Sequence, residues 1–298
     1  MKEPSPRASR LAIAGLCVAV ALVGGSGFLL GRATTERPVA PAARPGSAVP
    51  RPAPAPAPVA PAPTDRTMDR ADLLALVAAA SDAVATGAAI PGEVTRADGR
   101  RFEIRLPFGC DGSADAQSDA PMRWRYDGED NTLRIHVAPV AWRADDWLSP
   151  APPEAIEAVE GFWIPRPWTM SDACPPAGAN AMAAAAPPAI PQEQTVAIAQ
   201  FFAAGGARQA RRGSKPFETV VRLQPEALRA DRGFRLRISG RLAALGDRGP
   251  VLCRQPAGAA QRPVCMIGMT ADALSIENAA TDEMLANWTF EHREAVDR

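Results

Sequence analysis

An uninterrupted apolar run near the start of the chain constrains its folding most. Residues 11–30 read "LAIAGLCVAVALVGGSGFLL" and contain no charged side chain. A helix needs about 20 apolar residues to cross the hydrocarbon core of a bilayer. The preceding residues, 1–10, include three basic side chains and one acidic side chain, and a basic flank is typical of the cytoplasmic side. We therefore predict a transmembrane signal anchor over residues 11–31, with a cytoplasmic tail over residues 1–10.

This anchor would make the chain a single-pass inner-membrane protein whose bulk is periplasmic. Two alternatives stay open. A cleaved signal peptide could end at Ala40-Pro41-Ala42, although this tripeptide lies well beyond the apolar run. A lipoprotein signal could end at Cys17, although Leu16 stands before it where a small residue is preferred.

Residues 32–67 are rich in proline and alanine, as in "RPAPAPAPVAPAP". Proline fixes φ and lacks an N–H, so this stretch cannot form a helix or the interior of a sheet. It should instead be extended polyproline II, which rises about 3 Å per residue. We predict a disordered linker that acts as a spacer before the folded part.

Composition limits the chemistry of the chain. The formal net charge is zero, with 33 basic and 33 acidic residues, so there is no electrostatic case for binding nucleic acid. The chain has only two histidines and one tyrosine, while a serine or cysteine nucleophile usually needs a histidine base. We find no phosphate-binding glycine loop or zinc-protease motif. The sequence therefore predicts no catalytic residue, no cofactor and no metal.

Four cysteines lie beyond the apolar run, namely Cys110, Cys174, Cys253 and Cys265. An even number in an exported chain favours disulfides. Their spacings match neither the C-x₂₋₄-C pairs of zinc sites nor the C-x-x-C of redox dithiols. We predict a bridge across "CRQPAGAAQRPVC" and, by remainder, a second bridge between the other two. Closing the shorter loop should contribute about 3 kcal/mol.

Hydrophobic periodicity predicts a mainly β fold of the α+β class. Apolar residues at helical spacing indicate a helix over 69–86, with Asp69 and Gly87 as its caps. Alternation of apolar and polar residues indicates strands, among them a hairpin over 122–138 and a strand over 233–242. A second short helix is predicted over 153–160. We expect an antiparallel sandwich or a barrel-like domain with peripheral helices.

Low-complexity sequence divides this part of the chain. Residues 181–192, "AMAAAAPPAIPQ", are predicted to be a loop between two β lobes. The first lobe, residues 68–180, would include the long helix. The second lobe would cover residues 193–298. Each lobe would then hold one of the two disulfides.

Two segments are candidates for binding. The loop "RQARRGSK" is the one local basic cluster and could contact an anionic envelope polymer or lipid head groups through Arg208, Arg211, Arg212 and Lys215. A solvated loop is the alternative. The segment "GFWIPRPWTMSDACPP" gathers Phe162, Trp163 and Trp168 among prolines. It could form a binding surface or close the edge of a core.

Three weaker signals have ordinary explanations. Residues 111–122 follow a calcium-loop template in part, but Ala116 and Met122 replace its glycine and its glutamate. His136 falls on the polar side of the predicted hairpin. Asp145 and Asp146 lie beside tryptophans, as carboxylates do in glycosidases, but adjacent residues do not by themselves form an acid–base pair.

These features favour a membrane-anchored periplasmic binding or scaffolding module of the cell envelope. Its expected partners are the membrane itself and an envelope protein or an anionic polymer. The alternative is an envelope hydrolase that uses carboxylates in the region of Asp145 and Asp146.

Overall fold

In the computed structural model the described residues are 66–148, 156–176, 194–203, 211–213, 215–245, 248–256 and 258–290. All of them belong to one compact unit, Pro61–Arg298. The predicted anchor and nearly all of the predicted linker lie outside the described residues. No helix within the described ranges is long and apolar enough to span a membrane.

Strands are the main regular structure of this unit, with a few helices beside them. The helical elements are α2 (Arg70–Thr86), α3 (Gly92–Thr95), α4 (Asp145–Leu148) and the 3₁₀ turn η3 (Pro225–Ala227). The strands are β1 (Arg101–Phe108), β2 (Met122–Asp127), β3 (Thr132–Val137), β4 (Val140–Trp142), β5 (Ile156–Trp163), β6 (Val196–Ala203), β7 (Phe217–Arg222), β8 (Phe234–Leu242), β9 (Val251–Arg254), β10 (Val264–Asn278) and β11 (Met284–Thr289). The fold is therefore mainly β, as predicted.

The larger sheet has eight strands in the order β1-β8-β10-β6-β5-β4, with β9 and β11 also paired to β10. Its long strand β10 has four partners, of which only β6 runs parallel to it. The sheet is consequently mixed, while every other pairing in it is antiparallel. The smaller sheet is the antiparallel set β2-β3-β7.

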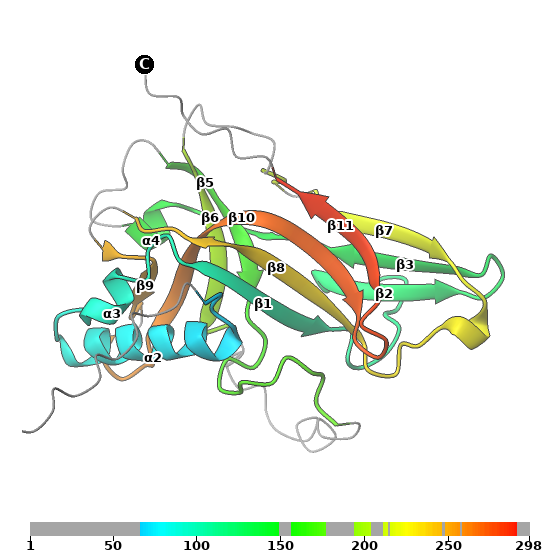
Figure 1. Ribbon diagram of the computed structural model, residues 1–298, viewed down its shortest axis with the longest axis horizontal. Coiled ribbons are helices and arrows are strands. Elements are labelled where there is room, and N and C mark those ends of the chain that lie inside the picture. The colour runs from blue at the N-terminus through cyan, green and yellow to red at the C-terminus, as the bar shows by residue number, and fades with distance from the viewer. Residues whose placement is uncertain are drawn as a thin grey trace, which may run out of the picture. The chain divides into compact units, whose positions relative to one another are not determined.

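One hydrophobic core joins both sheets and the long helix. Figure 1 shows α2 and α3 near one end of the long strands and β2, β3 and β7 near the other. Trp124 of the small sheet meets Phe234 of the large sheet at 5.5 Å between ring centroids, and Phe217 meets Trp288 at 5.1 Å. Leu73 of α2 is fully buried in the same cluster.

Helix α2 begins and ends where the sequence predicts. The Asp69 side chain accepts a hydrogen bond from the Asp72 N–H, while the Asp72 side chain accepts one from the Asp69 N–H. This reciprocal pair satisfies two N–H groups that a helix start leaves open. Gly87 closes the helix with φ at 67°, a conformation that glycine adopts without strain.

The predicted helix over 153–160 is wrong where the structure describes it, because residues from Ile156 onward form strand β5. This strand pairs with β6 over its length and with β4 over part of it. Gly161 allows the close pairing, since a Cβ there would lie 2.0 Å from the Ile198 carbonyl oxygen. Tertiary pairing therefore overrides the local helical preference of "EAIEAVE".

Strands from the two predicted lobes lie in one sheet. β1 and β5, from the first segment, flank β8, β10 and β6, from the second. Strands from before and after residues 181–192 thus belong to the same sheet. Residues 181–192 themselves lie outside the described residues. A period-2 pattern identifies a strand but not its neighbour, so the sequence left this arrangement open.

Both predicted cysteine pairings are seen in the structure. The Sγ atoms of Cys110 and Cys174 lie 2.10 Å apart, and those of Cys253 and Cys265 lie 2.05 Å apart. The second pair joins directly opposite residues of β9 and β10. The bridge predicted across this loop therefore joins two antiparallel neighbouring strands.

Candidate binding surface

The predicted anion-contact residues lie in different surroundings. Arg208 lies outside the described residues, and Lys215 is exposed. Arg211 approaches Glu157 at 2.5 Å and the buried Glu160 at 3.5 Å. The N–H groups of Arg212 and Gly213 both donate to the Glu160 carboxylate. Part of this basic cluster therefore neutralises the protein's own acidic residues.

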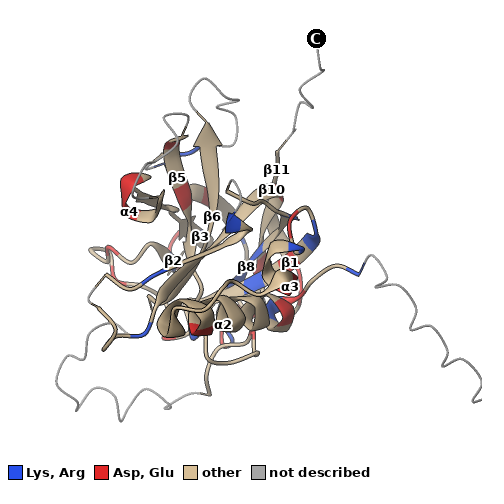
Figure 2. Ribbon diagram, turned by 90° about the vertical axis from the view of Figure 1, so that its left-hand side faces the viewer, with Lys and Arg blue, Asp and Glu red and all other residues tan. Residues whose placement is uncertain are grey.

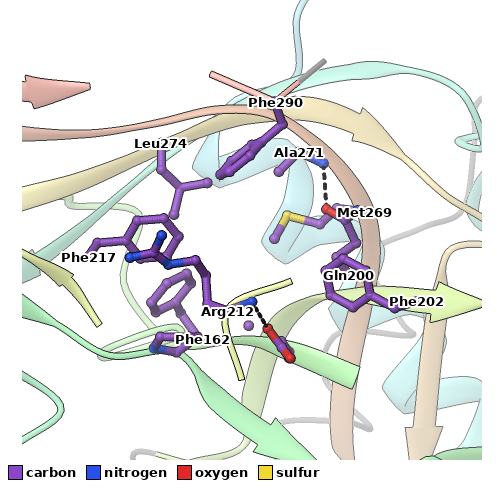
Figure 3. Close-up of a pocket in the computed structure, with 12 residues that line it drawn as sticks. Phe162, Gln200, Phe202, Arg212, Phe217, Met269, Ala271, Leu274 and Phe290 are labelled. Atoms are coloured by element: carbon purple, nitrogen blue, oxygen red, sulfur yellow. Dashed lines mark hydrogen bonds between the residues drawn. The ribbon is translucent and has the colours of Figure 1, made fainter. Parts of the chain in front are cut away.

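Arg212 also covers a small cavity between β5, β6, β7 and β10. Figure 3 shows its side chain extending over Phe217, whose ring centroid lies 4.6 Å from the guanidinium carbon. The walls are largely apolar and include four phenylalanines, and the cavity volume is about 30 Å³. This space suits a water molecule rather than an organic ligand.

The structure does not bring the candidate catalytic side chains Asp145, Asp146 and His136 together in one site. Asp145 and Asp146 are exposed on the short helix α4, which Figure 2 shows in red at the surface. The nearest cation to Asp145 is Arg143, at 3.7 Å. His136 instead contacts Glu218 across the small sheet at 2.9 Å. The exposed aspartates therefore give the hydrolase alternative no support beyond their sequence.

The structure also gives no further support to the partial calcium-loop template at residues 111–122. Within the described ranges, no group of three or more His, Cys, Asp or Glu side chains is placed to hold a metal ion. The acidic segment 111–119 belongs to the loop between β1 and β2.

The aromatic–proline segment divides into a buried part and an exposed part. Phe162 is buried, and Trp163 packs edge-on against Trp142 with ring centroids 5.4 Å apart. By contrast, Trp168 is 58% exposed and Met170 is 61% exposed. The loop that follows β5 therefore presents two large apolar side chains to solvent.

A buried arginine holds this loop in place. Arg70, in the first turn of α2, is only 5% exposed. Its guanidinium donates hydrogen bonds to the carbonyl oxygens of Pro165 at 2.6 Å, Thr169 at 3.0 Å and Arg166 at 3.1 Å. Burial lowers the pKa of the Arg70 guanidinium, but arginine remains charged in proteins. Because charged donors make the stronger hydrogen bonds, this contact fixes the backbone on both sides of Trp168.

Further contacts fix the rest of the loop. Arg166 has a positive φ of 45° and donates to the Ala173 carbonyl oxygen. The Ser171 and Ala173 N–H groups each donate a hydrogen bond to the side-chain hydroxyl oxygen of the residue two positions earlier in the chain. Cys174 then ties the end of the loop to Cys110. The loop is thus anchored at its start, middle and end.

Charged residues line two cavities along this loop. A cavity of about 240 Å³ lies beside Met170 and includes Arg70, Glu103, Arg105 and Asp172 in its walls. A second cavity of about 480 Å³ lies beside Cys174 and includes Asp231, Arg232, Arg235 and Asp282. The loop therefore carries exposed apolar side chains, with charges of both signs beside Met170 and beside Cys174.

Ion pairs organise the sheet face next to this loop. Glu277, which is buried, lies 3.1 Å from Arg105, 3.5 Å from Arg237 and 3.7 Å from Arg235. Glu103 bridges the first two of these arginines, at 2.8 Å and 2.5 Å. Burial lowers the pKa of Arg105, but its hydrogen bond to Glu277 and the charge of Glu103 outweigh burial and raise it. Arg105, Arg235 and Arg237 are therefore neutralised within the protein.

Comparison with known proteins gives no relative: no family model, no curated protein and no solved structure matches the chain. Sequence reasoning identified Trp168 but missed the arginine that holds its loop. A signal was present, because Arg70 is a cation in the first turn of a helix, where the macrodipole disfavours positive charge.

Proposed function

We propose that this protein is a membrane-anchored binding module of the cell envelope, which docks a protein partner through Trp168 and Met170. The observation that carries the proposal is the contact of Arg70 with three carbonyl groups of the loop that presents them. An exposed apolar side chain on a loose loop must be ordered when a partner binds. This loop is already ordered, so that entropic cost is reduced.

The composition of the surface fits a protein interface. Binding energy at such interfaces is concentrated in a few central residues, in which tryptophan is enriched, and methionine is enriched at interfaces generally. A polar rim surrounds that centre. Trp168 and Met170, with the charged residues of the cavities beside Met170 and Cys174, support such an arrangement. The expected partner has an apolar pocket bordered by charges of both signs.

The remaining parts of the proposal rest on the sequence. Residues 11–31 would anchor the chain in the inner membrane, with the bulk of the chain in the periplasm. Residues 32–67 would act as a spacer of roughly 100 Å when fully extended as polyproline II. Two cysteine pairs at disulfide distance suit an oxidising compartment.

Site-specific photo-crosslinking in cells that produce the full chain tests this function. A photoreactive phenylalanine analogue at position 168 or 170 should give one discrete adduct with a protein. The same analogue at position 220 or 284 should not, although Val220 and Met284 are 57% and 51% exposed. These positions are matched controls because they are equally accessible but lie outside the loop.

A second change links the adduct to the organised loop. Combining the probe at position 168 with Arg70→Met should reduce the adduct at least fivefold, while the protein level is followed by immunoblot. Equal adducts at all four positions, or none at positions 168 and 170, would refute the proposal.

A further inference from the structure

The outer face of the small sheet carries a group of arginines. This group is independent of the loop that follows β5 and ends at Cys174, here called the Trp168 loop. Side chains alternate along each strand, and Trp124, Ile135 and Phe217 point into the core. The opposite side of β2, β3 and β7 carries four arginines, here called the arginine face: Arg123, Arg125, Arg134 and Arg222. Three of them are exposed, and Arg123 is half-buried.

Strand register places these arginines in a diagonal line. Arg125 and Arg134 are directly opposite on neighbouring antiparallel strands, where Cβ atoms lie about 5 Å apart. Arg123 precedes Arg125 by one step along the same face, about 7 Å away. Arg222 of β7 lies opposite Thr132 of β3, which is two residues before Arg134. Arg222 is therefore the diagonal neighbour of Arg134 on the next strand. Successive guanidinium groups thus follow one another across all three strands.

Nearby acidic groups on this face are engaged elsewhere. Glu218 contacts His136, and the Asp127 carboxylate accepts the N–H groups of Glu129 and Asp130 in the hairpin turn. Among the described residues, no carboxylate lies within ion-pair distance of Arg125, Arg134 or Arg222.

Three arginines of the large sheet, by contrast, have carboxylate partners. There, Arg105, Arg235 and Arg237 each lie within 4 Å of Glu277, and two of them also contact Glu103. Like charges directly opposite each other on a sheet are destabilising. The arginine face carries this unfavourable pair without the compensating carboxylates that Arg105, Arg235 and Arg237 have.

We infer that the arginine face binds a linear polymer of phosphate groups. Arginine recognises phosphate through paired, charge-assisted hydrogen bonds. A linear chain can place successive phosphates along the diagonal and neutralise the opposed pair. One isolated phosphate can reach only neighbouring members of the line, so affinity should depend on chain length.

Two other anionic partners fit this face less well. A flat bilayer laid on it would also meet the acidic hairpin turn, with Asp127, Glu129 and Asp130. Single-stranded nucleic acid is usually held by aromatic side chains on which the bases stack. On the described outer side of this sheet no aromatic residue is available, since Trp124 and Tyr126 point inward.

Inorganic polyphosphate of defined chain length is the probe. Binding to the full chain should strengthen with length, and Arg125→Gln/Arg134→Gln should weaken it by about tenfold or more. The matched control is Arg101→Gln/Arg241→Gln, which removes another directly opposite, exposed arginine pair, on β1 and β8. Its neighbours on that face are paired with carboxylates, so binding should change less than twofold.

Two further readouts separate binding from a structural role. The slope of log affinity against log salt should become shallower by about 1.4 in the double variant, for two lost phosphate contacts at about 0.7 each. Without ligand at low salt, the double variant should melt at the same or a higher temperature, because a repulsion is removed. Lower melting would assign these arginines to folding and overturn the inference.

The inference would also be wrong if the arginine face preferred a different ligand. Equal affinity for single phosphate and long polyphosphate would contradict a linear site. Tighter binding to anionic lipid vesicles, or to single-stranded DNA of the same number of phosphates, would assign the face to those partners instead. None of these outcomes affects the Trp168 loop, which is tested by crosslinking at other positions.

Discussion

Replacing Cys110 and Cys174 by serine together is expected to lower the free energy of unfolding by about 4 kcal/mol. The two residues are 64 apart in sequence, and in the chain-entropy model the stabilisation rises with the logarithm of the loop length. Urea unfolding followed by tryptophan fluorescence is the measurement. All six tryptophans lie within the described unit, so the signal reports on that unit alone.

The other bridge provides the control for loop length. Replacing Cys253 and Cys265 by serine should cost about 3 kcal/mol, because that loop is much shorter, with a separation of 12. Only the first double variant should also reduce crosslinking at position 168, since Cys174 ends the Trp168 loop. A smaller loss from the longer loop would contradict the entropic ranking.

Replacing Arg70 by methionine is expected to lower the free energy of unfolding by about 3 kcal/mol. Methionine preserves apolar bulk but donates no hydrogen bond, so three carbonyl groups lose a charged partner. Such groups cost about 1–3 kcal/mol each when buried without a partner, and less where water can reach them. Hydrogen exchange of residues 165–173 should accelerate in the same variant, because the loop loses its main anchor.

Two substitutions bracket this effect. Arg96→Met changes an exposed arginine and should cost less than about 0.5 kcal/mol. Arg70→Lys should fall between the two methionine variants, because a single ammonium group lacks the planar geometry that reaches several carbonyls at once. If Arg70→Met left both stability and exchange unchanged, the loop would not depend on this arginine.

Local features of the fold could be predicted because their causes are local. The capping residues Asp69 and Gly87 mark both ends of α2. The turn-forming cluster after Asp127 joins β2 to β3, and alternation along 234–242 marks β8. The short cysteine spacing at 253–265 restricts the pairing of those two residues. In each case the determining groups lie within a few residues of one another.

Non-local features could not be predicted in this way. Nothing within "EAIEAVE" reveals that β4 and β6 lie on either side of it, so the local pattern alone predicts a helix there. The same limit hid the joining of both predicted lobes in one sheet. The charge of the segment 208–215 predicts an anion site, but the sequence does not show that Glu160 is a partner of Arg211 and Arg212.

By itself, the sequence determined which residues form α2, most of the strands and the two cysteine pairs, and it marked the aromatic segment around Trp168. Only the tertiary structure decided which arginines are neutralised and which are not, and that Arg70 holds the exposed loop. The physical reason is that propensity and periodicity act over a few residues. Charge compensation and strand pairing depend instead on groups that are distant in the chain and meet only after folding.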